Sequence, residues 1–194
     1  MLDETQLKIM DAAMTLIIEK GYSGATTKNI AKLAGVNEST IFRRFEGKKE
    51  IVTAAMELPK WNPGLTESDF ICHGDLEEDL ISFSRVYMSK VTPQMVKISL
   101  GLRSKELEGA ALPGIMKVPM VFKKVLESYF TQMIASGKIC DCNVESISLQ
   151  FLAMNFGFVF LEASFGEKLV GVSREEYIRN SIKVFVSGIR EKRI

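Results

Sequence analysis

The sequence is poor in the side chains that most catalytic and metal sites need. Its 194 residues include one histidine, His73, three cysteines and one tryptophan. With one histidine, the chain cannot form a multi-histidine metal site, and we expect no histidine-based catalytic triad. No glycine-rich phosphate-binding loop is present, since Gly35 and Gly47 are expected in turns. We therefore expect no enzyme, and neither a cofactor nor a metal.

The cysteines number three, and an odd number argues against a framework of disulfides. The N-terminal sequence MLDETQLKIMD is acidic and amphipathic, which is unlike a signal peptide, so we expect reduced thiols in the cytoplasm. Cys140 and Cys142 form a C-x-C pair, and with Cys72 they would suit a thiolate-rich metal or redox sensor. Because C-x-C alone is a weak motif, ordinary partly exposed thiols are the simpler interpretation.

Strand-like alternation, internal repeats and uninterrupted apolar runs are also lacking. The longest apolar stretch, 147–165, is broken by Ser148, Gln150, Asn155 and Glu162. A buried helix of a bundle is therefore favoured over a membrane span. With 46% hydrophobic residues, the chain can build one small domain and a larger helical body. The sequence predicts an all-α fold.

Charge is balanced overall but not locally. The chain has 25 Lys and Arg against 24 Asp and Glu, a net charge of +1. Residues 20–49 carry +5, which leaves −4 for the rest of the chain. The basic residues of this segment are Lys20, Lys28, Lys32, Arg43, Arg44, Lys48 and Lys49, against Glu38 and Glu46. Such a patch suits a polyanionic partner, although a charged run is often only a solvated surface.

The same segment contains a helix-turn-helix pattern. Thr26 or Thr27 is placed to cap a first helix, Gly35 supplies the positive-φ residue that ends it, and Asn37 caps a second helix. The apolar face of the first helix is predicted to contain Ile30, Ala31, Leu33 and Ala34, and that of the second Ile41, Phe42 and Phe45. An ordinary corner between two core helices is the alternative. Because the motif and the basic patch coincide, DNA binding is favoured.

These residues resemble the TetR/AcrR family of bacterial transcriptional regulators. The matching elements are Thr26–Thr27, Ile30–Ala31, Ala34–Gly35–Val36, Asn37, Thr40–Ile41–Phe42, Phe45 and Lys48. The strong resemblance covers residues 5–55, and the rest agrees in length and helical layout. It implies an N-terminal three-helix helix-turn-helix DNA-binding domain, residues 1–58 with the motif at 26–45. A helical ligand-binding and dimerisation domain would occupy residues 59–194.

The resemblance implies contacts with double-stranded DNA at a palindromic operator. The expected DNA-binding residues are Thr27, Lys28, Asn37, Glu38, Ser39, Thr40, Phe42, Arg43, Arg44 and Lys48. The family usually has tyrosine where this chain has Phe42, so a hydroxyl contact to phosphate is missing. Arg43 and Arg44 stand where aromatic residues or histidine are common, and they suit bidentate contacts to guanine or phosphate. The substitutions should change the operator sequence while keeping the binding mode.

The last two predicted helices indicate a homodimer. The first, from Asn143 to about Phe165, is apolar nearly all round, and the second begins at a capping box of Ser173 and Glu176. A four-helix bundle made by two subunits would bury both sides of the first helix. The expected interface residues are Phe151, Phe158, Ile178, Ile182, Phe185 and Ile189. A buried monomeric core is the alternative.

The family resemblance also implies a pocket for an unknown small-molecule effector in the helical body. The candidate lining residues are Phe83, Tyr87, Met88, Met95, Ile98, Arg103, Met116, Met120, Phe122, Tyr129 and Met133. Their methionines suit an adaptable, mostly apolar cavity. The same pattern is also typical of an ordinary helical core, and both interpretations stay open at this stage.

Two functions are compatible with these observations. The first is a dimeric repressor that a small, mostly apolar ligand releases from its operator. The second is an interaction or recruiting protein on the same scaffold, with weak or accessory DNA binding. Whether a DNA-binding regulator represses or activates depends on where its operator lies relative to a promoter.

Overall fold

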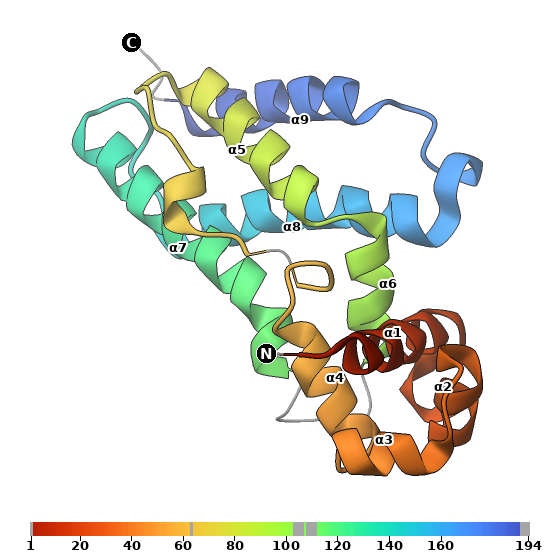
Figure 1. Ribbon diagram of the computed structural model, residues 1–194. Helices are drawn as coiled ribbons and strands as arrows, with labels where there is room; N and C mark the ends of the chain where they lie inside the picture. The colour runs from red at the N-terminus through yellow and green to blue at the C-terminus, as the bar shows by residue number, and fades with distance from the viewer. Residues whose placement is uncertain (1, 63, 103–106, 108–111, 191–194) are drawn as a thin grey trace. The chain divides into compact units, whose positions relative to one another are not determined.

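A computed structural model describes residues 2–62, 64–102, 107 and 112–190. Across these residues the chain is all-α, as predicted, with one isolated bridge between Ile139 and Arg190. The α-helices are α1 (Glu4–Gly24), α2 (Thr27–Ala34), α3 (Glu38–Arg44), α4 (Lys48–Met56), α5 (Leu76–Lys90), α6 (Pro93–Gly101), α7 (Leu112–Ala135), α8 (Val144–Phe165) and α9 (Arg174–Ile189) (Figure 1). Two short 3-10 helices are η1 (Glu67–Asp69) and η3 (Gly166–Lys168).

The chain forms two compact units, one of residues Met1–Pro63 and Gln94–Met116, the other of Gly64–Pro93 and Lys117–Ile194. The predicted domain limits, 1–58 and 59–194, did not anticipate that α6 belongs to the first unit. The reason lies in long-range packing. A Cβ on Gly101 would lie 2.7 Å from the Ile17 carbonyl oxygen, so only glycine lets α6 approach α1 this closely.

The first unit is built around α1, which packs against both α2 and α4. Its core contains Ile9, Met14 and Ile17 of α1, Ile30 of α2 and Ile51 of α4, all fully buried. Asp3 caps α1 through a reciprocal capping box with Gln6. These contacts fix the short helices α2 and α3, which are too short to be stable alone.

The second unit is held together by α5, α7, α8 and α9, and α5 runs beside α9 (Figure 1). Asp75 caps α5, Asn143 caps α8 and Ser173 caps α9, and the last two lie where those helices were predicted to begin. The helix α7 has Pro119 inside it. By length and composition α8 could cross a membrane, but Phe151, Asn155 and Phe158 on one of its faces are buried in the protein.

Within the second unit, a buried carboxylate of α5 joins the preceding loop to α7. Asp79 is fully buried and accepts hydrogen bonds from the amides of His73 (2.7 Å) and Gly74 (2.9 Å) and from the Tyr129 hydroxyl (3.0 Å). Burial, followed by the bond to Asp79, raises the pKa of the Tyr129 hydroxyl. Tyr129 therefore stays protonated and donates this bond at physiological pH.

Candidate nucleic-acid interface

The predicted helix-turn-helix is present as α2, a tight turn and α3. The Thr26 side chain caps α2 by accepting a hydrogen bond from the Asn29 amide at 3.2 Å. Gly35 ends α2 in the left-handed conformation, with φ of 69°. Asn37 occupies the N-cap position of α3, but its side chain makes no capping bond, which differs from the prediction. Instead the Asn37 amide group lines a hollow beside the helix.

The two faces of α3 are clearly separated. Ile41 is fully buried and Phe45 is 8% exposed, so this face holds α3 on the first unit. Glu38, Ser39 and Arg43 are exposed on the other face. Phe42 was grouped with the apolar face of this helix and was also expected to contact DNA; it is 55% exposed, so it lies on the outer face, away from Ile41. Since Phe42 is one position beyond Ile41, the helical rotation turns it outward.

The first helix of the motif shows a similar difference. Ile30 and Ala31 of α2 are buried, as predicted, whereas Leu33 is 54% exposed. The Lys28 side chain is exposed at the start of α2. Thr27 is half-buried, and its hydroxyl donates a hydrogen bond to the Glu38 carboxylate at 2.6 Å. This bond joins the N-terminal ends of α2 and α3.

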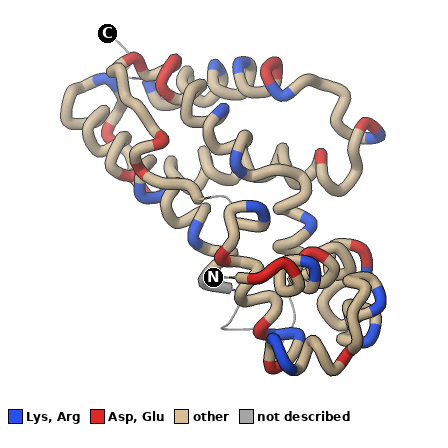
Figure 2. The backbone as a smooth tube through the Cα atoms, viewed as in Figure 1, with Lys and Arg blue, Asp and Glu red and all other residues tan. Residues whose placement is uncertain are grey.

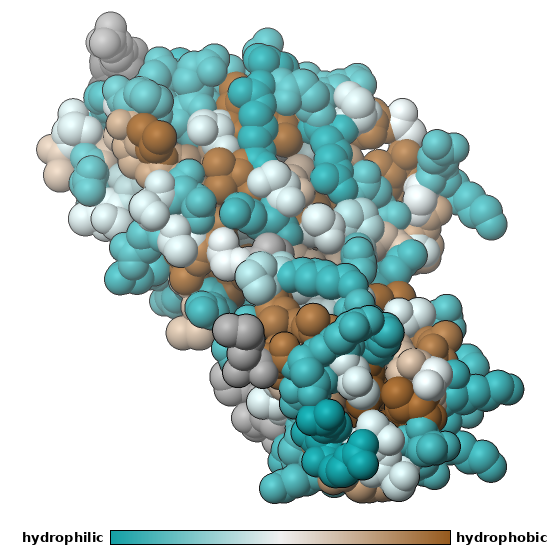
Figure 3. Space-filling view, viewed as in Figure 1, coloured by the Kyte–Doolittle hydropathy of each residue, from teal (hydrophilic) through white to brown (hydrophobic). Residues whose placement is uncertain are grey.

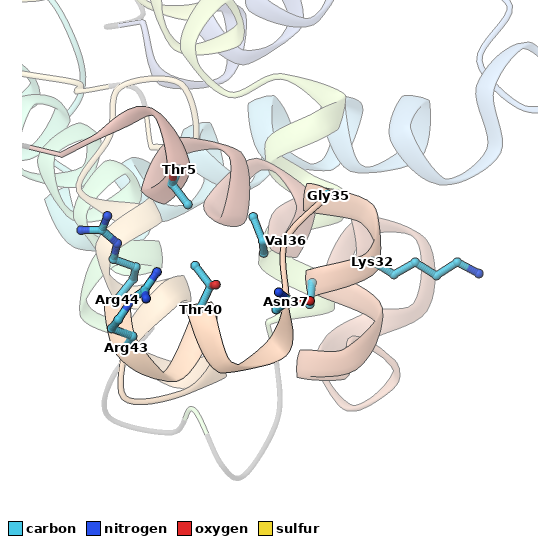
Figure 4. Close-up of a pocket in the computed structure, with 9 residues that line it drawn as sticks. Thr5, Lys32, Gly35, Val36, Asn37, Thr40, Arg43 and Arg44 are labelled. Carbon is cyan, nitrogen blue, oxygen red and sulfur yellow. The ribbon is translucent and has the colours of Figure 1, made fainter.

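A polar hollow of about 430 Å³ lies between α1, α2 and α3 (Figure 4). Thr5 of α1 and Thr40 of α3 lie on opposite sides of it, and the Lys32 side chain extends away from it. Its lining residues are Thr5, Ala31, Lys32, Gly35, Val36, Asn37, Thr40, Arg43 and Arg44. The hollow therefore brings together hydroxyl, amide and guanidinium donors, which are groups that bind phosphate oxygens.

Basic residues follow one another closely along the backbone at the end of α3 and the start of α4 (Figure 2). On the face seen in Figure 3, the surface over α3 is mostly hydrophilic. Arg44 pairs with Asp3 at 2.8 Å, between guanidinium and carboxylate atoms. At the first residue of α4, the Lys48 ammonium donates to the Tyr22 carbonyl oxygen at 2.7 Å. The same ammonium lies 3.8 Å from the centroid of the Tyr22 ring.

Sequence reasoning missed four residues that shape this surface. Asp3, Thr5 and Tyr22 belong to α1 or its cap, so only the folded chain brings them beside α3 and α4. Lys32 was counted in the basic segment but was not selected as a site residue. Its position beside the hollow depends on the angle between α2 and α3, which the sequence pattern does not specify.

The predicted dimer-interface residues have to be corrected. Phe151, Phe158, Ile178, Ile182 and Ile189 are between 0% and 8% exposed within one chain, so they form its core rather than an outer face. Phe185 is half-buried and contacts the ring of Phe151. The exposed side of these helices instead contains Val184, 73% exposed, beside a hollow of about 400 Å³. That hollow is lined by Met154, Asn180, Ser181, Val184 and Phe185.

The predicted effector-pocket residues are distributed over both units and differ in burial. Phe83, Tyr87, Met88, Phe122, Tyr129 and Met133 are buried in the second unit. The Tyr87 and Phe122 rings stack with centroids 4.4 Å apart, and those of Phe83 and Tyr129 are 5.1 Å apart, which is core packing. Ile98 is buried in the first unit, and Met95 is half-buried there. Met116 and Met120 are exposed, and Arg103 lies outside the described residues.

The cysteines offer no support for the sensor interpretation. Burial, followed by the nearby Asp79 carboxylate, raises the pKa of the Cys72 thiol. Burial and the neighbouring Cys140 raise the pKa of the Cys142 thiol. A raised pKa disfavours the thiolate that reacts or binds metal. Within the described residues, no group of three or more His, Cys, Asp or Glu side chains is arranged to hold a metal ion.

The chain is similar to bacterial transcriptional regulators in each comparison with known proteins. Residues 9–55 match the model of bacterial regulatory proteins of the tetR family. The uncharacterized HTH-type transcriptional regulator YvkB of Bacillus subtilis (strain 168) is 29% identical over 187 residues, 95% of this chain and 97% of that protein. The biofilm operon icaADBC negative transcriptional regulator IcaR of Staphylococcus aureus (strain Newman) is 43% identical over 44 residues, 23% of this chain and 24% of that protein.

A solved structure extends the similarity in fold to nearly the whole chain. The regulator FadR of Bacillus subtilis, solved in complex with stearoyl-CoA, has a TM-score of 0.63 and 22% identity. The match covers 95% of this chain and 99% of that one. At this identity the match establishes the fold alone.

Proposed function

The chain belongs to the TetR family of HTH-type transcriptional regulators, and from this premise we propose that it is a dimeric, sequence-specific DNA-binding repressor in the cytoplasm. The observation that carries the proposal is the outer face of α3. This face presents Glu38, Ser39, Phe42 and Arg43 to solvent, while Ile41 and Phe45 anchor the helix beneath it. An exposed polar helix on a rigid support is the form that enters a major groove.

The proposed contacts fall into two groups. Lys28 and Lys48 are assigned to backbone phosphates because they lie in the first turns of α2 and α4, where the helix dipole favours an anion. Arg44, the last residue of α3, is assigned to a phosphate because its exposed guanidinium group is a strong donor. Thr27, Asn37 and Thr40 add polar contacts that set the position of the helix. Base reading is assigned to the outer face of α3, where Arg43 suits guanine, Glu38 suits cytosine, Ser39 suits several bases and Phe42 suits the thymine methyl group.

We also propose that two subunits pair through the exposed side of α8 and α9. Val184 protrudes next to the hollow formed by Met154 and Phe185. In a two-fold dimer the same patch is used by both subunits, so a protruding group beside a hollow can fit its own copy. Such a dimer would bind a palindromic operator with half-sites about 34–36 Å apart.

A small, mostly apolar effector is the proposed release signal. IcaR is described as a negative regulator, and FadR was solved with stearoyl-CoA, so repression and ligand binding both occur among similar proteins. For release, the effector must bind the DNA-free conformation more tightly than the DNA-bound one. A coupling free energy of about 1–3 kcal/mol would weaken operator binding about 5–150-fold.

An electrophoretic shift assay tests the proposal, using DNA that flanks the protein's own gene and a duplex of mixed sequence. The wild-type protein should shift both duplexes and prefer its operator. The triple variant Arg43→Ala, Arg44→Ala, Lys48→Ala should lose operator binding while it keeps its helical circular-dichroism spectrum. Operator binding that is unchanged in a folded triple variant would refute the proposed interface. A wild-type protein that shifts neither duplex would favour the recruiting function instead.

A further inference from the structure

One carboxylate at the start of α1 makes two different contacts. The Asp3 atom Oδ1 accepts the Gln6 amide at 2.8 Å, and the Asp3 amide donates to the Gln6 side chain at 3.0 Å. Its other oxygen, Oδ2, lies 2.8 Å from Nη1 of Arg44. Because the cap fixes the first oxygen, the direction of the second is also fixed. Asp3 therefore presents an anionic oxygen to the guanidinium at the end of α3.

The Asp3–Arg44 ion pair lies at the surface that is proposed to bind DNA. The side chains of Asp3 and Arg44 are each 40% exposed, so a DNA phosphate can approach the guanidinium that the carboxylate occupies. Arg44 also lines the hollow beside Thr5, the second residue after Asp3. Phosphate and carboxylate oxygens seek the same N–H donors, so binding of one at Nη1 displaces the other.

We propose that Asp3 limits DNA affinity by competing with a backbone phosphate for Arg44. This inference rests on the proposed DNA-binding function. With the ion pair intact, Arg44 contributes less than a full positive charge to the surface. A duplex has to break the pair before Arg44 can neutralise a phosphate. An exposed ion pair of this kind is worth little, so the effect on affinity is up to about five-fold.

The test uses Asp3→Asn, because asparagine caps a helix about as well as aspartate but carries no charge. Binding to the operator and to a mixed-sequence duplex would be measured by fluorescence anisotropy over a range of salt concentrations. Asp3→Asn should tighten binding to both duplexes about two- to five-fold and steepen the salt slope by up to about 0.9. In the Arg44→Gln background the same substitution should have no effect.

Two comparisons make the result specific. Glu4→Gln removes one negative charge from the adjacent residue, whose carboxylate pairs with Lys8 rather than with Arg44. An equal gain in DNA affinity for Glu4→Gln would mean that the effect comes from net charge alone, and this would overturn the proposal. A gain for Asp3→Asn that persists in the Arg44→Gln background would overturn it for the same reason. Weaker binding by Asp3→Asn would overturn it too, since Asp3 would then position Arg44. If the wild-type protein binds neither duplex, the proposed function itself fails.

Discussion

Removing the ammonium group of Lys48 should weaken binding to every DNA sequence by a similar factor. Lys48 is the first residue of α4, where the helix dipole favours an anion. Its bond to the Tyr22 carbonyl and its position over the Tyr22 ring hold the ammonium in one place. An ammonium group carries three N–H donors, so the bond to Tyr22 does not by itself exclude a phosphate.

The size of the effect follows from counterion release. If Lys48 neutralises one phosphate, Lys48→Ala should reduce the slope of log affinity against log salt concentration by about 0.9. Between about 50 and about 200 mM salt, the ratio of wild-type to variant affinity should then shrink about 3.5-fold. Base preference should stay the same, because a phosphate contact carries no direct sequence information.

The assay is an anisotropy titration of operator and mixed-sequence duplexes at several salt concentrations. Lys48→Met keeps a long aliphatic side chain without the ammonium group and should lose as much of the salt slope as Lys48→Ala. Lys49→Ala removes the same charge from the next, exposed residue and should change the slope less. Urea unfolding should show that Lys48→Ala remains folded, with a loss of about 2 kcal/mol expected from the hydrogen bond and the cation–π contact with Tyr22.

Three results would refute this reasoning. An unchanged salt slope in folded Lys48→Ala would mean that Lys48 contacts no phosphate and serves only to join α4 to Tyr22. A loss confined to one operator position would mean that it reads a base. An equal loss in Lys49→Ala would mean that the segment acts through its total charge rather than through the geometry at Tyr22.

Two further predictions concern base reading and assembly. Replacing single thymines of the operator by deoxyuridine should weaken the wild-type protein about four-fold at one position of each half-site, the value of one buried methyl group. Phe42→Ala should bind more weakly and show no further loss there, whereas retention of the full deoxyuridine effect in Phe42→Ala would exclude the contact. Val184→Asp should turn the dimer into a folded monomer in sedimentation experiments, because a lone carboxylate would be buried at the subunit contact. Lys183→Asp, on a neighbouring exposed residue, should leave the dimer intact, and a wild-type monomer at micromolar concentration would exclude the proposed assembly.

The sequence was most informative where structure depends on neighbouring residues. The caps at Thr26 and Ser173 were predicted, because such a cap depends only on a side chain and an amide three residues later. Gly35 was predicted in the left-handed conformation for the same local reason. The cap at Thr26, the turn at Gly35 and the charge of residues 20–49 together located the helix-turn-helix correctly.

Predictions that depend on tertiary packing were less successful. The sequence of α8 is apolar nearly all round, so it does not indicate which side faces the core. Phe151 and Phe158 were therefore assigned to the dimer interface although they are buried within one chain. Phe42 was grouped with the apolar face of its helix, yet it is exposed, and an exposed apolar side chain is common at surfaces that bind a partner. The close approach of Gly101 to Ile17 depends on residues far apart in the sequence.

The acidic groups of the interface explain how a protein with so small a net charge could bind DNA selectively. Basic side chains attract any duplex, and a genome offers a very large excess of sites without the operator sequence. Asp3 and Glu38 are held on this surface by Arg44 and Thr27, so neither carboxylate can simply turn away from an approaching phosphate. Each carboxylate would therefore lower the affinity for DNA below the value that the basic side chains alone would give. A cytosine amine opposite Glu38 would recover part of that cost, whereas a misaligned duplex would not. Selectivity would then arise from where the negative charges are fixed as well as from where the arginines lie.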